Sequence, residues 1–150
     1  MSIERLQKLV HAAVPVLFAQ IHGGRIRCES EATLQLHLGR IISTMGDLAL
    51  VHPHETFSIE LEKPLTGSRR GRIDVWFSLT TANRLEWRCA IELKFFKRTN
   101  QREPNNRYDV FEDIARLESC KDIADLGFML VGTDHPHYIE QGTYSTATHD

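Results

Sequence analysis

Cysteine is scarce in this chain of 150 residues, and long hydrophobic runs are absent. The three cysteines, Cys28, Cys89 and Cys120, are odd in number and widely spaced, which argues against a disulfide framework. Three are also too few for the four-cysteine ligation of an iron–sulfur cluster. No segment approaches the roughly 18 apolar residues of a membrane-spanning helix, and the N-terminus has no signal-peptide pattern. We therefore expect a reduced, cytoplasmic protein.

The motifs of several common enzyme classes are also missing. The sequence contains no glycine-rich phosphate loop, no GxSxG elbow and no CxxC pair. His-Pro-His occurs at 52–54 and again at 135–137, but the intervening proline predicts loops, and neither copy has a third ligand at zinc spacing. A hydrophobic content of 41% and a charged content of 25% are ordinary for one soluble globular domain, which we assign to residues 1–150.

Two predicted strands carry acids where buried strands normally carry apolar side chains. Because strand side chains alternate between faces, Asp74 is expected opposite the face of its apolar neighbours, and Glu92 shares a face with Lys94. Charge is rarely placed among apolar strand residues unless it is paired, bound to metal or used in catalysis. The strands are 71–77 (GRIDVWF) and 89–96 (CAIELKFF), and the expected apolar faces are Ile73, Val75 and Phe77 in the first and Ile91, Leu93 and Phe95 in the second.

This set of charges suits hydrolysis of a phosphodiester bond with the help of a hard cation. Mg²⁺ prefers oxygen ligands and takes one or two carboxylates, with water and phosphate oxygens completing its shell. Asp74 and Glu92 are the candidate carboxylate ligands, and the main-chain carbonyl of Leu93 is a third candidate. Lys94 is the candidate to orient or deprotonate the attacking water, or to neutralise charge on the phosphate. The structural alternative is that these acids only form ion pairs on a solvated sheet surface.

Asp74, followed eighteen positions later by Glu92-Leu93-Lys94, resembles the signature of the PD-(D/E)XK phosphodiesterases, the restriction-endonuclease-like nucleases. The proline that usually precedes the aspartate is replaced by Ile73. The resemblance implies a metal-dependent endonuclease with Mg²⁺ or Mn²⁺ as cofactor, DNA as the expected substrate, and products with 5′-phosphate and 3′-hydroxyl ends. It also implies an α/β (α+β) fold, with a three-layer core in which helices flank a central mixed sheet.

Periodicity predicts the element order α α β β β α β, which agrees with that resemblance. Ser30 is a suitable N-cap for the second helix, and Pro15 is expected to kink or end the first. The family-like core is expected at 30–131, preceded by a helical extension at 1–24 and followed by a polar tail at 138–150. The predicted helices are 2–21, 30–49 and 108–120, and the predicted strands are 56–61, 71–77, 89–96 and 127–132.

Positive charge is concentrated around the candidate site, although the whole chain has a net charge of −2. The segment 66–107 contains ten basic and four acidic residues. Contacts to backbone phosphates supply most of the sequence-independent affinity for nucleic acid, so this distribution favours a nucleic-acid-binding surface. The structural alternative is an ordinary solvated surface. The candidate phosphate-binding residues are Arg69, Arg70, Lys97, Arg98 and Arg102.

A further acid is expected from the helix that precedes the sheet. In the resembled family an acid on this helix sometimes reaches the metal or its waters, and Glu31 is the candidate for that catalytic role. Glu29 and Glu60 are alternatives for the same role, and Glu31 and Glu29 also suit the positive end of a helix dipole.

A non-catalytic module that binds nucleic acid or protein on the same fold is the alternative function, because a fold does not fix an activity. No separate element that reads base sequence is apparent. The sequence leaves open whether DNA or RNA is bound, which sequence or structure is preferred, and whether the chain forms a homo-oligomer.

Overall fold

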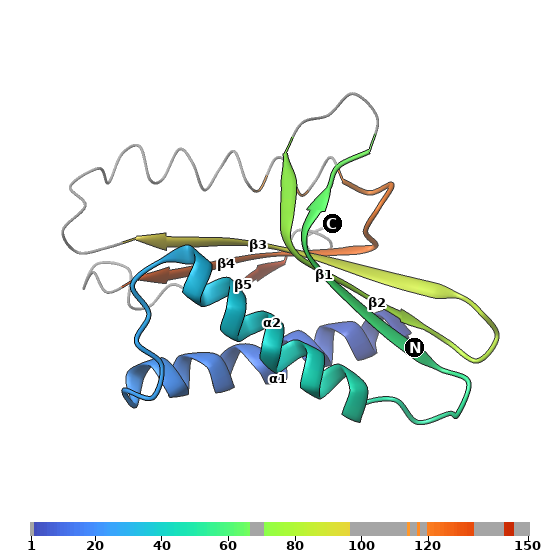
Figure 1. The fold of residues 1–150 in the computed structure, drawn as a ribbon. Helices are drawn as coiled ribbons and strands as arrows, with labels where there is room; N and C mark the ends of the chain where they lie inside the picture. The colour runs from blue at the N-terminus through green and yellow to red at the C-terminus, as the bar shows by residue number, and fades with distance from the viewer. Residues whose placement is uncertain are drawn as a thin grey trace.

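Two helices come first along the chain, and a mixed sheet of five strands follows, which gives an α+β fold (Figure 1). The computed structural model describes residues 2–66, 71–96, 114, 117, 120–133 and 143–145. The helices are α1 (Ser2–His22) and α2 (Glu31–Leu48), and the strands are β1 (Thr56–Pro64), β2 (Arg72–Thr80), β3 (Glu86–Phe96), β4 (Leu126–Thr133) and β5 (Thr143–Ser145).

Both predicted N-terminal helices are confirmed. Of the two effects expected of Pro15, a kink or an end of the helix, the end is wrong, because α1 continues to His22. Tertiary packing explains this, because Ala13 and Leu17 are buried in the core on either side of the exposed proline. At the start of α2, Ser30 has extended backbone angles and its hydroxyl accepts a hydrogen bond from the Thr33 N–H at 3.2 Å, so the predicted N-cap is confirmed.

The strands lie in the order β1-β2-β3-β4-β5 within one sheet. The first three are antiparallel neighbours, β4 runs parallel to β3, and β5 is antiparallel to β4. The four predicted strands are therefore confirmed, each somewhat longer than expected. The short strand β5 lies in the segment predicted to be a polar tail, and it pairs Tyr144 with Met129. Periodicity does not indicate a strand of three residues whose pairing comes from a distant segment.

Side chains on the two faces of the sheet form separate apolar clusters. Both helices lie on one side of the sheet (Figure 1), and this face contributes Val75, Phe77, Ile91 and Leu93 to the larger cluster. Phe95 packs against the same cluster, so the predicted apolar face of β3 is confirmed. The opposite face contributes a second cluster that includes Trp76, Ala90, Phe96, Met129 and Val131.

The helix predicted at 108–120 lies almost entirely outside the described residues. Within it, Ile114 and Leu117 are helical, and Leu117 is buried in the second cluster. The described part of the chain therefore comprises two helices packed on one face of a mixed sheet.

Candidate active site

The candidate site lies where β2 and β3 separate. Their last paired residues are Val75 and Ile91, but β3 continues to Phe96 beside β4, and β2 extends back to Arg72 beside β1. One end of β2 therefore has β1 as its neighbour and no longer has β3. We call this region, residues 72–74 and 92–96, the open end of the sheet.

The backbone of β1 is also distorted near this end. Glu62 has φ 57, a left-handed conformation that non-glycine residues rarely adopt, and the pairing of β1 with β2 is interrupted there, between Leu61 and Lys63. The sequence prediction that Ile73 shares a face with Val75 is wrong, because Ile73 packs in the second cluster and Val75 in the first. A local distortion of a strand can turn a side chain to the other face of the sheet, and the alternation of apolar residues in the sequence does not reveal such a distortion.

The register brings the two predicted metal-binding acids onto neighbouring strands. Asp74 precedes Val75 on β2 and Glu92 follows Ile91 on β3, so each acid lies one residue beyond the last paired residues of the two strands. Glu92 is only 2% exposed, whereas Asp74 is partly buried. A carboxylate as buried as Glu92 requires compensation by hydrogen bonds, an opposite charge or a metal.

The carboxylate of Asp74 lies against the backbone of β3. Its Oδ2 atom accepts a hydrogen bond from the Leu93 N–H at 2.7 Å, on the edge of β3 that β2 has left. The N–H and C=O of one strand residue point to the same edge, so the Leu93 carbonyl is directed to the same side as this carboxylate. The side chain of Leu93 is 3% exposed in the larger cluster, which leaves only its main chain for the role predicted from the sequence.

Glu31, at the start of α2, reaches the same edge of β3. Its Oε1 atom accepts a hydrogen bond from the Phe95 N–H at 3.3 Å and lies 3.9 Å from the Nζ atom of Lys94. Two carboxylates from different elements thus bind successive N–H groups of this edge, those of Leu93 and Phe95. Lys94 is 22% exposed, so its ammonium group is held beside Glu31 and can still be reached from solvent.

The contacts of Asp74 and Glu31 differ in one respect. Asp74 contacts the main chain of Leu93, whereas Glu31 contacts the main chain of Phe95 and also lies 3.9 Å from the ammonium group of Lys94. Glu31 is therefore placed beside the lysine.

The other acids considered for this role lie elsewhere. Glu60 forms an ion pair with Lys63 at 2.6 Å, and the Lys63 ammonium lies 4.3 Å from the centre of the Trp76 ring. Glu29 forms an exposed ion pair with Arg27 at 2.9 Å. Among the three alternatives, Glu31 has the hydrogen bond to β3.

None of the five predicted phosphate-binding residues can be placed. Arg69, Arg70, Lys97, Arg98 and Arg102 lie outside the described residues, so the basic surface stays a prediction.

The donors at the open end are compatible with a hard cation, but they do not form a cage. Within the described residues, no three His, Cys, Asp or Glu side chains form a group that could hold a metal ion. The candidate metal ligands are all oxygen atoms, from the carboxylates of Asp74 and Glu92 and from the Leu93 carbonyl. Two carboxylates are enough for Mg²⁺ when water and phosphate oxygens complete its coordination shell. The residues therefore fit a cation that is largely coordinated by water and substrate.

The sequence analysis missed Gln35, which lies one helical turn after Glu31. Its Nε2 atom donates a hydrogen bond to the main-chain oxygen of Asp74 at 2.7 Å and lies 3.3 Å from Oε1 of Glu62. A glutamine within an amphipathic helix gives no signal of its own. Only its helical spacing from Glu31 hints at a shared surface.

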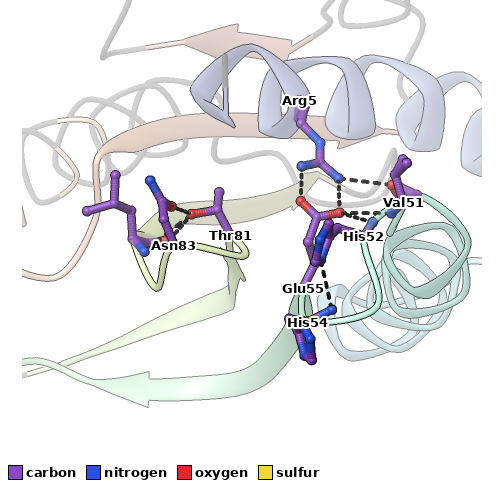
Figure 2. A network of polar contacts seen from close by, with 9 residues as sticks. Arg5, Val51, His52, His54, Glu55, Thr81 and Asn83 are labelled. Atoms are coloured by element: carbon purple, nitrogen blue, oxygen red, sulfur yellow. Dashed lines mark hydrogen bonds and ion pairs between the residues drawn. The ribbon is translucent and has the colours of Figure 1, made fainter.

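A second polar network lies at the opposite end of the β1–β2 hairpin (Figure 2). Glu55 accepts hydrogen bonds from both terminal nitrogens of Arg5 and from the N–H groups of Val51 and His52. These bonds lower the pKa of Glu55 from the ordinary 4.5 to about 2, with the Arg5 bond as the largest cause. The same bond raises the pKa of Arg5. Glu55 thereby fixes the loop between α2 and β1 onto α1.

Comparison with protein-family models, with curated proteins and with solved structures found no match. Among the described residues, no helix is both long and apolar enough to cross a membrane.

Proposed function

We propose that this chain is a metal-dependent nuclease that hydrolyses phosphodiester bonds, with DNA as the expected substrate, on a restriction-endonuclease-like core. The observation that carries the proposal is the open end of the sheet, where the carboxylate of Asp74 contacts the backbone of Leu93, next in sequence to the buried Glu92. Acids placed among apolar strand residues at a strand separation are costly to bury, which favours a functional role for them.

Each residue has a defined task in this proposal. Asp74 and Glu92 would hold Mg²⁺ or Mn²⁺ together with the Leu93 carbonyl, and a cation bound there supplies Lewis acidity toward the phosphate. Lys94 donates hydrogen bonds to the attacking water or to a phosphate oxygen. Glu31 lies 3.9 Å from that ammonium and limits where it can point.

The supporting geometry is a fixed strand rather than a loop. β3 is paired with β4 from Cys89 to its end at Phe96, so Glu92, Leu93 and Lys94 are presented by a rigid element. Groups on rigid elements hold their geometry more closely, which catalysis requires. The α+β fold with this element order also supports a restriction-endonuclease-like core.

A second candidate function is a binding module without catalytic activity. One observation favours it, because Asp74 and Glu31 both accept hydrogen bonds from the main chain of β3, as structural carboxylates do. In that case the acids would complete the edge of β3 and would need no metal.

One experiment separates the two functions. Purified intact chain is incubated with duplex, single-stranded and branched DNA and with RNA, in the presence of Mg²⁺, Mn²⁺ or EDTA. Asp74→Asn, Glu92→Gln and Lys94→Met are purified in parallel, with Glu60→Gln as a matched control outside the site. Cleavage that needs metal and disappears in the three site variants alone supports the nuclease. Binding without cleavage, unchanged by metal, supports the module.

A further inference from the structure

Gln35 joins α2 to both strands of the β1–β2 hairpin. Its side-chain nitrogen donates to the main-chain oxygen of Asp74 at 2.7 Å, and it lies 3.3 Å from Oε1 of Glu62. An amide nitrogen has two hydrogens, so one group can serve both acceptors. The glutamine is partly buried, and it touches the strand residue whose carboxylate defines the candidate site.

The end of β2 that carries Asp74 lies beyond the pairing of β2 with β3. The ladder between these strands ends at Val75 and Ile91, so in the described residues this end of β2 has β1 as its neighbouring strand. That neighbour is distorted at Glu62, whose φ of 57 is unfavourable for a residue with a side chain. Strained backbone persists only where surrounding contacts fix it, and the contact with Gln35 is one of these.

The same helix also holds β3. Glu31 lies four residues before Gln35 on α2, so both side chains lie on one side of the helix. Glu31 accepts from the Phe95 N–H of β3, while Gln35 donates to Asp74 of β2. The first two turns of α2 therefore connect the two strands across the gap that separates them.

From this arrangement we infer that Gln35 is a positioning residue, which fixes β2 so that the carboxylate of Asp74 meets the N–H of Leu93. The structural part of the inference stands on the contacts alone, and its consequence for metal use rests on the proposed function. Loss of the Gln35 donor lets the end of β2 relax away from β3. Asp74 then loses its alignment with the Leu93 backbone, although no site residue has changed.

The test uses two variants of Gln35 and one control. Gln35→Leu replaces the side chain with one of similar size that has no hydrogen-bond donor. Gln35→Glu keeps the shape of the side chain but replaces the donor with an acceptor. If one of the two variants fails to fold, the other still tests the inference. Thr44→Ala is the control, because it removes a side-chain hydrogen bond from the same helix, to the Arg40 carbonyl at 2.9 Å, away from the site.

The first readout does not depend on activity. Amide hydrogen exchange and the pH dependence of the Leu93 amide shift, both followed by NMR, report whether the Asp74 carboxylate still contacts this N–H. We expect faster exchange and a smaller pH-dependent shift at Leu93 in the Gln35 variants, but not in Thr44→Ala. The inference is overturned if the exchange rate and the pH-dependent shift of the Leu93 amide in both Gln35 variants equal those of the intact chain or of the control.

The second readout is the Mg²⁺ concentration needed for half-maximal cleavage, together with Mg²⁺ affinity measured by calorimetry without nucleic acid. Loss of a partner that orients a metal ligand typically costs roughly 10- to 100-fold in affinity or activity, and we expect a change of this size in the Gln35 variants. If the intact chain neither binds Mg²⁺ nor cuts, the proposed function fails, and the Leu93 amide still decides the positioning role. If the intact chain cuts nucleic acid and the Gln35 variants need the same Mg²⁺ concentration as the intact chain, the inference fails while the proposed function stands.

Discussion

The two ends of the antiparallel part of the sheet hold their acids in different ways. At one end, which we call the closed end, all three strands are still paired, through Thr56 with Thr80 and Thr80 with Glu86. The acid there, Glu55, is enclosed by Arg5 and two backbone N–H groups. At the open end, β2 and β3 have separated, and Asp74 reaches across to β3.

The difference shows what distinguishes a structural acid from a candidate functional one. The side chain of Glu55 is 6% exposed. Its hydrogen bonds to the guanidinium group of Arg5 and to the loop at Val51 and His52 (Figure 2) are sufficient to explain its presence. Glu92 is 2% exposed in a strand of mainly apolar residues, two residues before a lysine. Burial of a charged group beside another charged group is typical of functional sites, and this is the basis of the proposed function.

The largest expected effect is on the cleavage rate, and it should differ between variants at the open end and at the closed end of the sheet. We expect Asp74→Asn to reduce the rate about 10²–10⁴-fold, the range for loss of an essential catalytic group, with little change in melting temperature. Glu55→Gln is the matched change at the closed end, and it should lower the melting temperature while leaving the cleavage rate at low temperature intact. Cleavage assays and thermal unfolding measure both. Equal loss of activity in the two variants would contradict the comparison.

A smaller effect is expected from the acid that contacts Lys94. Glu31→Gln keeps an oxygen for the Phe95 N–H but removes the charge beside the ammonium, and we expect about a 10-fold to 100-fold slower cleavage. The control is Glu60→Gln, whose exposed pair with Lys63 should contribute less than about 1 kcal/mol to the free energy of unfolding. Slower cleavage in Glu60→Gln than in Glu31→Gln would reverse our assignment of the helix acid.

A substitution in the contact between α2 and β1 near the closed end should change the stability of the chain without changing the open end. A Cβ atom at Gly46 would lie 2.4 Å from Cζ of Phe57, so Gly46→Ala should lower the free energy of unfolding in urea by about 1–3 kcal/mol. Gly39→Ala is the control on the same helix, since its Cβ would lie 3.2 Å from the movable end of Leu61. If Gly39→Ala destabilises the chain as much, the close contact with the Phe57 ring is not the cause.

The smallest expected effect is confined to acid pH and concerns Glu55. Its folded pKa, about 2, lies below the ordinary 4.5, so folding favours the charged form. This stabilisation is fully present above pH 4.5 and is lost as the pH falls toward 2. Between those values the intact chain should lose more stability than Glu55→Gln, as measured by urea unfolding at several pH values. Parallel curves for the two proteins would show that Glu55 does not contribute to the acid sensitivity.

Much of the fold follows from local sequence pattern. Ser30 marks the start of α2, and the alternation of apolar residues in 89–96 gives the two faces of β3. These features depend on neighbours within one or two turns or along one strand, which periodicity records directly. The acids Asp74 and Glu92 could be selected on the same basis, since each interrupts an apolar strand.

Other features depend on contacts between distant segments. Local pattern gives no sign that β2 pairs with β3 only from Val75 onward, that Pro15 is accommodated within α1, or that β5 adds to the sheet. Pairing and helix docking are decided by the packing of the whole chain, which can override local preference.

The sequence by itself determined which residues carry charge among apolar neighbours and which segments form helices and strands. Tertiary structure decided which groups that charge contacts. The docking of α2 brings Glu31 to Phe95 and Gln35 to Asp74, across 64 and 39 residues of sequence. The physical reason is that periodicity reports the face on which a side chain lies, whereas the partner of that side chain is set by how the elements pack.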